Sequence, residues 1–128
     1  MKGVISLDSQ EIKWVASSAP RMVLKFKALP EREQRAKARE IACWVSIVER
    51  VTPPPAATSA LTTYKLSRVQ LKELRNLVID QVAILITRTL PAYEARLSKD
   101  AKLAGYITKV KELRDGLLGL SRKIEEAL

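Results

Sequence analysis

Apolar side chains recur at helical spacing in the last quarter of the chain. They step by three and four residues through Leu103, Tyr106, Val110, Leu113, Leu117, Leu120, Ile124 and Ala127. This alternation places them on one side of a helix and is typical of a coiled-coil seam. It predicts a helix over residues 106–127 that pairs within the chain or across subunits. Gly116 and Gly119 lie inside it and indicate either close approach of a neighbouring backbone or simple tolerance, because glycine weakens a helix interior.

The same periodicity predicts a helix over residues 31–51. Pro30 and the acidic side chains that follow it favour a helix start, because proline needs no donor there and acids suit the positive end of the helix dipole. Apolar positions then recur from Ala38 to Val51. The three successive prolines that follow cannot continue a helix, so residues 52–64 are predicted to be a Pro-rich connector.

A third helix is predicted over residues 65–89, with Ser67 as its N-cap and Pro91 beyond its end. Its second half is apolar on nearly every side, which is typical of a helix that lies at the centre of a bundle or is covered by a second copy. A buried strand over residues 84–87 is the competing interpretation, since β-branched side chains are dense there.

The flanking segments give weaker signals. Asp8, followed three residues later by Glu11, forms a capping-box pattern and predicts a helix start. Pro20 predicts a break or kink in that helix. Residues 21–29 fit a short strand or a further helical turn, with the helix favoured, and residues 91–102 fit a shorter helix.

These segments predict an all-α fold, an antiparallel four- or five-helix bundle with a coiled-coil-like C-terminal helix. Residues 67–89 would form its central element. The chain has 128 residues, a typical length for one domain, so we expect a single domain over residues 1–128.

Composition then excludes most kinds of catalysis. The chain has no histidine, which removes imidazole bases, histidine triads and most zinc sites. No phosphate-binding glycine loop and no paired cysteines are present, and Cys43 lies in an apolar run with no histidine to activate it. We therefore expect a non-enzymatic protein with no cofactor, no catalytic residue and no metal site.

The single cysteine also bears on location. It cannot form an internal disulfide, and no signal-peptide pattern opens the chain, so we expect a reducing, cytoplasmic setting. The most apolar run, residues 77–87, includes Asp80 and is too short to cross a bilayer. We expect no membrane partner.

The distribution of charge is the most informative feature. Lysine and arginine number 23 against 14 acidic residues, which gives a formal net charge of +9. Helical spacing sets many of these cations in three rows, with Tyr64 beside the second as a candidate for base stacking. The candidate binding residues are Arg32, Arg35 and Arg39; Tyr64, Lys65, Arg68, Lys72 and Arg75; and Arg96, Lys99 and Lys102.

Such rows favour a polyanionic partner. Cations along a helix neutralise phosphates and release counterions, which gives affinity for RNA or DNA without sequence readout. We therefore predict a basic accessory protein that binds nucleic-acid backbone, as a subunit of a larger nucleoprotein complex or as an oligomer. The alternative is a structural or regulatory helical interaction module, a homo-oligomer or the partner of another protein, whose charge serves solubility or docking to an acidic surface. Nearby acids such as Glu31, Glu40 and Glu94 would then pair with part of the charge.

Overall fold

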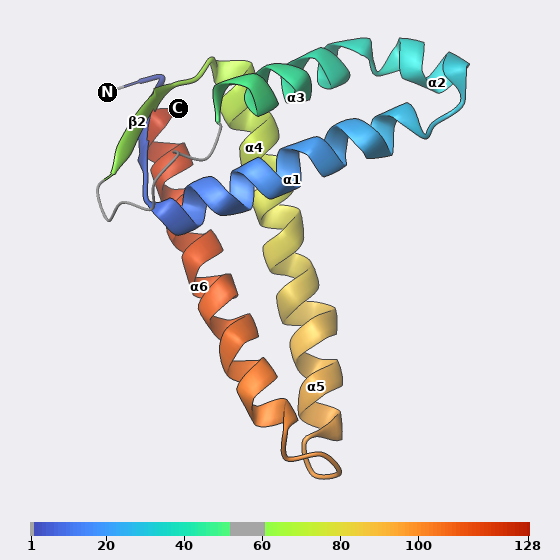
Figure 1. Ribbon diagram of the computed structural model, residues 1–128, viewed down its shortest axis with the longest axis vertical. Helices are drawn as coiled ribbons and strands as arrows, with labels where there is room; N and C mark the ends of the chain where they lie inside the picture. Colours follow the sequence, from blue (N-terminus) through green and yellow to red (C-terminus); the bar gives the residue numbers. More distant parts are fainter. Residues whose placement is uncertain (1, 52–60) are drawn as a thin grey trace.

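The computed structural model describes residues 2–51 and 61–128, and it is mostly helical (Figure 1). In chain order the elements are β1 (Val4–Leu7), α1 (Ser9–Lys27), α2 (Glu31–Ala36), α3 (Ala38–Arg50), β2 (Thr62–Lys65), α4 (Arg68–Ile84), the π-helical segment η1 (Leu85–Thr89), α5 (Leu90–Arg96) and α6 (Leu103–Ala127). The mostly helical prediction is confirmed. The Pro-rich connector falls largely on residues 52–60, outside the described residues, and its last positions form part of β2.

The helices form two parts that meet at one junction. Helix α4 continues through η1 and α5, and α6 returns antiparallel beside it, so that the two make a long hairpin (Figure 1). Helices α1 and α3 pack on each other and form an arm that crosses one end of this hairpin, with α2 at the arm's outer end. The predicted antiparallel pairing is therefore present in the hairpin, whereas the arm lies across it.

Two prolines do not break their helices as predicted. Helix α1 is continuous through Pro20, and residues 21–27 are helical. Pro91 lies near the start of α5 in an uninterrupted helical rod. Just before it the helix widens into η1, where the N–H of Leu90 donates to the carbonyl of Leu85 five residues back. A π-turn changes the hydrogen-bond spacing where proline supplies no donor, which lets the rod continue. The strand interpretation of residues 84–87 is wrong.

The helix predicted over residues 31–51 is divided in two. Lys37, with φ −102° and ψ 14°, separates α2 from α3. The Gln34 side chain of α2 donates from Nε2 to the carbonyls of Lys27 and Leu29, at 2.9 and 2.7 Å. These bonds satisfy carbonyls at the end of α1 and fix α2 across it.

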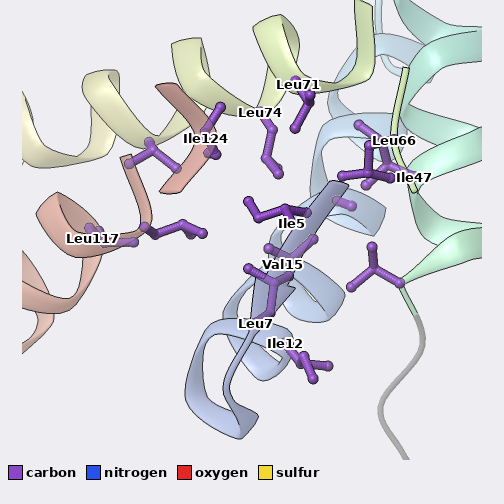
Figure 2. Close-up of a cluster of buried hydrophobic side chains, with 14 of the residues drawn as sticks. Ile5, Leu7, Ile12, Val15, Ile47, Leu66, Leu71, Leu74, Leu117 and Ile124 are labelled. Carbon is purple, nitrogen blue, oxygen red and sulfur yellow. The ribbon is translucent and has the colours of Figure 1, made fainter. Parts of the chain in front are cut away.

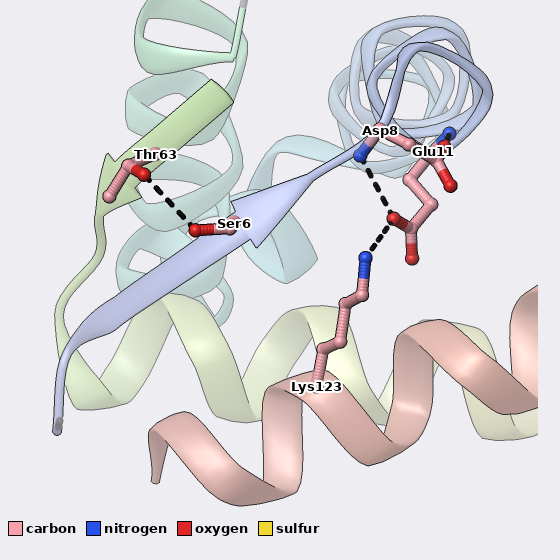
Figure 3. Close-up of polar contacts among 5 residues, drawn as sticks. All are labelled: Ser6, Asp8, Glu11, Thr63 and Lys123. Carbon is pink, nitrogen blue, oxygen red and sulfur yellow. Dashed lines mark hydrogen bonds and ion pairs between the residues drawn. The ribbon is translucent and has the colours of Figure 1, made fainter. Parts of the chain in front are cut away.

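A two-stranded antiparallel sheet, absent from the sequence-based prediction, pairs the N-terminal segment with the segment that precedes α4. Strands β1 and β2 pair with Ile5 opposite Tyr64, and the hydroxyls of Ser6 and Thr63 are 3.0 Å apart (Figure 3). Gly3 precedes β1 at φ +78°, donates to the carbonyl of Ala127 and accepts from the N–H of Leu66. The sheet is thereby tied to the end of α6.

The hydrophobic core lies at the junction of the arm, the sheet and the hairpin (Figure 2). Trp44, Leu7, Ile12, Ile47, Leu71, Leu74 and Ile124 are among its fully buried side chains. The apolar row predicted along α6 is buried only in part. Its second half, from Leu117 to Ala127, is buried, whereas Tyr106 and Leu113 in the first half are exposed. Beyond the junction, no other element among residues 2–51 and 61–128 packs on the hairpin as a third layer.

Candidate nucleic-acid interface

The ten predicted binding cations all lie at the surface. Nine are exposed and Arg75 is half-buried. Within residues 2–51 and 61–128, ion pairs involve only two of the ten: Arg35 with Glu31 at 3.1 Å, and Arg75 with Glu125 at 3.4 Å. The Arg35 pair is almost fully exposed, where such pairs contribute little free energy. Most of the predicted cations therefore keep their charge available to a partner.

The first row lies on α2 and at the start of α3, at the outer end of the arm. None of the side chains of α2 is buried, so this helix presents its charges without contributing to the core. Exposed Lys27 and Lys37, which the sequence analysis did not select, extend the row. We call this group the arm cluster: Lys27, Arg32, Arg35, Lys37 and Arg39.

The second row lies where β2 leads into α4. Ser67 caps α4 as predicted: its hydroxyl accepts from the N–H of Gln70, whose side chain accepts from the N–H of Ser67. Gln70 Nε2 also donates to Ser46 of α3 at 2.8 Å, which anchors the start of α4 on the arm. This start therefore has a fixed position relative to α3.

Arg50 joins the second row, although the sequence analysis missed it. Its guanidinium donates to the backbone carbonyl of Lys65 at 2.6 Å, so it lies beside the predicted cations without pairing with an acid. Only the fold reveals this proximity, because fifteen residues separate the two positions. We call this group the α4 cluster: Arg50, Lys65, Arg68 and Lys72.

The two clusters lie at opposite ends of α3. Arg39 and Arg50 are eleven residues apart, about 16 Å along the helix axis at 1.5 Å per residue. Their spacing brings both side chains to the same side of α3, and the middle of that side, Cys43 and Ser46, is buried or half-buried. Exposed Ala42 and Val45 lie between the clusters along the helix, where small side chains leave room for another molecule to approach.

The structure separates the third row from these clusters. Arg96 ends α5, while Lys99 and Lys102 lie in the turn before α6, at the end of the hairpin remote from the arm (Figure 1). Tyr64, the candidate for base stacking, is partly buried and packs against the core. Burial raises the pKa of its hydroxyl above the ordinary value of 10.0. Much of its ring therefore packs in the protein and is not available to stack on a base.

Two open hollows, of about 860 and 450 Å³, lie where α1 crosses the hairpin. Trp14 and Leu113 line both, so we treat the hollows as one surface, the α1 corner. Its five cations are Arg21, Lys25, Arg88, Lys109 and Lys123. Its five acids are Asp8, Glu11, Glu73, Asp80 and Glu112. The corner is thus neutral, and the net charge of +9 is carried by the rest of the chain.

Among the described residues, no group of three or more cysteine, aspartate or glutamate side chains could hold a metal ion. Cys43 is buried, and desolvation, with the negative charges of Glu73 and Glu40, raises its pKa to about 11. A thiol that stays protonated near neutral pH is a poor nucleophile.

None of the described helices is long and apolar enough to cross a membrane. Comparison with known proteins adds no relative: no protein-family model, no curated protein and no solved structure matches this chain significantly.

Proposed function

We propose that this chain is a non-enzymatic accessory protein that binds the backbone of nucleic acid without strong sequence specificity. The observation that carries the proposal is the pair of cationic clusters at the two ends of α3. Of their nine members only Arg35 forms an ion pair within the described residues, and that pair is exposed.

The geometry suits phosphate contacts rather than base readout. Cations about 16 Å apart at the two ends of one helix reach two separated points of a phosphate backbone, and each contact releases counterions. Direct readout of base edges needs a helix or ribbon seated in a groove, or aromatic rings available for stacking. Tyr64, next to Lys65, and Phe26, next to Lys27, are both partly buried against the core.

Fluorescence anisotropy with labelled single- and double-stranded RNA and DNA, from about 50 to 300 mM salt, tests the proposal. Two double variants each reverse two charges of one cluster: Arg32→Glu with Arg39→Glu in the arm cluster, and Arg68→Glu with Lys72→Glu in the α4 cluster. Each should weaken binding at least about tenfold. Each should also reduce the log–log salt slope by about 1.8, since one phosphate contact to duplex DNA contributes about 0.9.

The turn between α5 and α6 supplies the matched control, because the third predicted row lies there, apart from both clusters. Lys99→Glu with Lys102→Glu makes the same change, four charge units, at two exposed residues remote from the clusters. Binding by this control should stay close to that of the wild type. The proposal fails if the wild type binds none of the four nucleic acids at low salt. It also fails if the control loses as much affinity as the cluster variants, because net charge alone would then explain binding.

A second function, helical protein–protein interaction, is favoured by a separate observation. The hairpin exposes large apolar side chains, among them Ile79, Ile84, Ile86, Tyr106 and Leu113. Apolar groups gathered on one element mark an interaction surface more often than scattered ones do. The two functions are compatible, because these residues lie apart from the cationic clusters.

A further inference from the structure

We propose that the α1 corner is the docking site for a second copy of this chain, with the hairpins of the two copies packed face to face. The inference does not depend on nucleic-acid binding. It concerns a different surface, and its salt dependence has the opposite sign.

The hairpin is incompletely buried in the single chain. Helix α5 packs against α6 and η1. Leu113 of α6 is 43% exposed and Ile84 of α4 is 39% exposed, and both line the corner. Tyr106, 56% exposed, lies two helical turns from Leu113 on the same face of α6. A pair of helices buries only one side of each, and the usual completion is a four-helix bundle.

The shape of the α1 corner also favours the docking of a second hairpin. Trp14 and Met22 from α1 and Leu77 from α4 line the larger hollow and are partly buried. They form an apolar surface where the arm overhangs the hairpin. A second hairpin that lies antiparallel on the first would bring its Tyr106 towards Trp14 and Met22. A twofold axis would then make both contacts at once, since an isologous interface uses the same patch on each copy.

Charge favours a second copy over an acidic partner. Two molecules of net charge +9 repel each other, and contact through a neutral face adds the least repulsion. The α1 corner, with five cations and five acids, is such a face. A polyanion would instead favour the cationic clusters.

Sedimentation equilibrium, at about 100 µM protein and so well above a micromolar Kd, tests the proposal. We expect the wild type to have twice the 14.3 kDa mass of one chain, and the dimer to persist or strengthen as salt screens the like charges. Leu113→Glu should yield a monomer, because it puts a charge into the apolar contact. Leu118→Glu is the matched control: Leu118 is also on α6 and 40% exposed, but it does not line the corner. This variant should remain dimeric.

Gly116→Leu keeps the test decisive if Leu113→Glu fails to fold. Gly116 lines the corner, and a Cβ added there meets nothing within 4 Å in the single chain. The variant should therefore fold, as its circular dichroism melt would show, yet dissociate because leucine occupies space that the second copy needs. A wild type that stays monomeric at high salt overturns the proposal. So does equal dissociation of Leu113→Glu and Leu118→Glu, or a folded Gly116→Leu variant that remains fully dimeric.

Discussion

Lys123 of α6 donates to Glu11 of α1, with 2.5 Å between Nζ and Oε1 (Figure 3). The same carboxylate oxygen accepts the backbone N–H of Asp8, at 3.0 Å. One side chain, only 10% exposed, therefore completes the N-terminal cap of α1 and ties that helix to the hairpin. The position of the arm across the hairpin depends in part on this pair.

Replacement of Lys123 by methionine should reduce the free energy of unfolding by about 1–3 kcal/mol. The carboxylate of Glu11 would stay buried without its cation, and the loss of one partner of a buried pair costs more than the pair contributes. Urea denaturation measures the change. Arg35→Met is the control: it breaks an ion pair whose members are 78% and 83% exposed, and should change stability by about 0.5 kcal/mol or less. Equal losses in the two variants would contradict the structural role of Lys123.

Gln70→Ala should destabilise the chain by about 1–3 kcal/mol. Gln70 is buried, completes the cap of α4 and donates to Ser46 of α3, so its removal leaves several polar groups without partners. Thermal and urea unfolding would both show the loss. Asn76→Ala, at an exposed position of the same helix, should have little effect. If the two substitutions behave alike, the cap and its bond to α3 contribute little.

The Cys43 thiol should react slowly with thiol reagents at pH 8 in the folded protein and rapidly in urea, because burial keeps it protonated. Its folded pKa of about 11 exceeds the ordinary value of 9.0. The unfolded chain therefore loses this proton first as pH rises. The stabilising contribution is complete below pH 9 and is lost towards pH 11, by up to about 2–3 kcal/mol. Stability of the wild type should fall more steeply over this interval than that of Cys43→Ala, and parallel curves would contradict the shift.

Substitution of two glycines by alanine should have effects of opposite sign. Gly3 has φ +78°, and an added Cβ would lie 3.3 Å from the carbonyl oxygen of Leu66, so Gly3→Ala should cost about 1–2 kcal/mol. Gly119 lies within α6, where an added Cβ meets nothing within 4 Å. Gly119→Ala in dilute protein should therefore stabilise the chain by up to about 1 kcal/mol. Denaturation of both variants under one set of conditions provides the comparison.

Sequence alone located the features that depend on neighbouring residues. The cap of α1 at Asp8 and Glu11 and the cap of α4 at Ser67 are present as predicted, because a cap is a set of hydrogen bonds within one turn. The long C-terminal helix was predicted from its apolar spacing, although it begins three residues earlier than expected. The exposure of most candidate cations likewise follows from the cost of burying charge.

The features that depend on residues distant in sequence were determined by the tertiary structure. Strands β1 and β2 each have four residues and form only because they pair with each other, 57 residues apart at Ser6 and Thr63. The extent of the rod through Pro91, the proximity of Arg50 to Lys65 and the exposure of Leu113 also follow from long-range packing. Local hydrogen bonds and spacing fix where a helix begins and which side is apolar. Only the packing of the arm against the hairpin determines which apolar sides are buried and where the cationic rows lie.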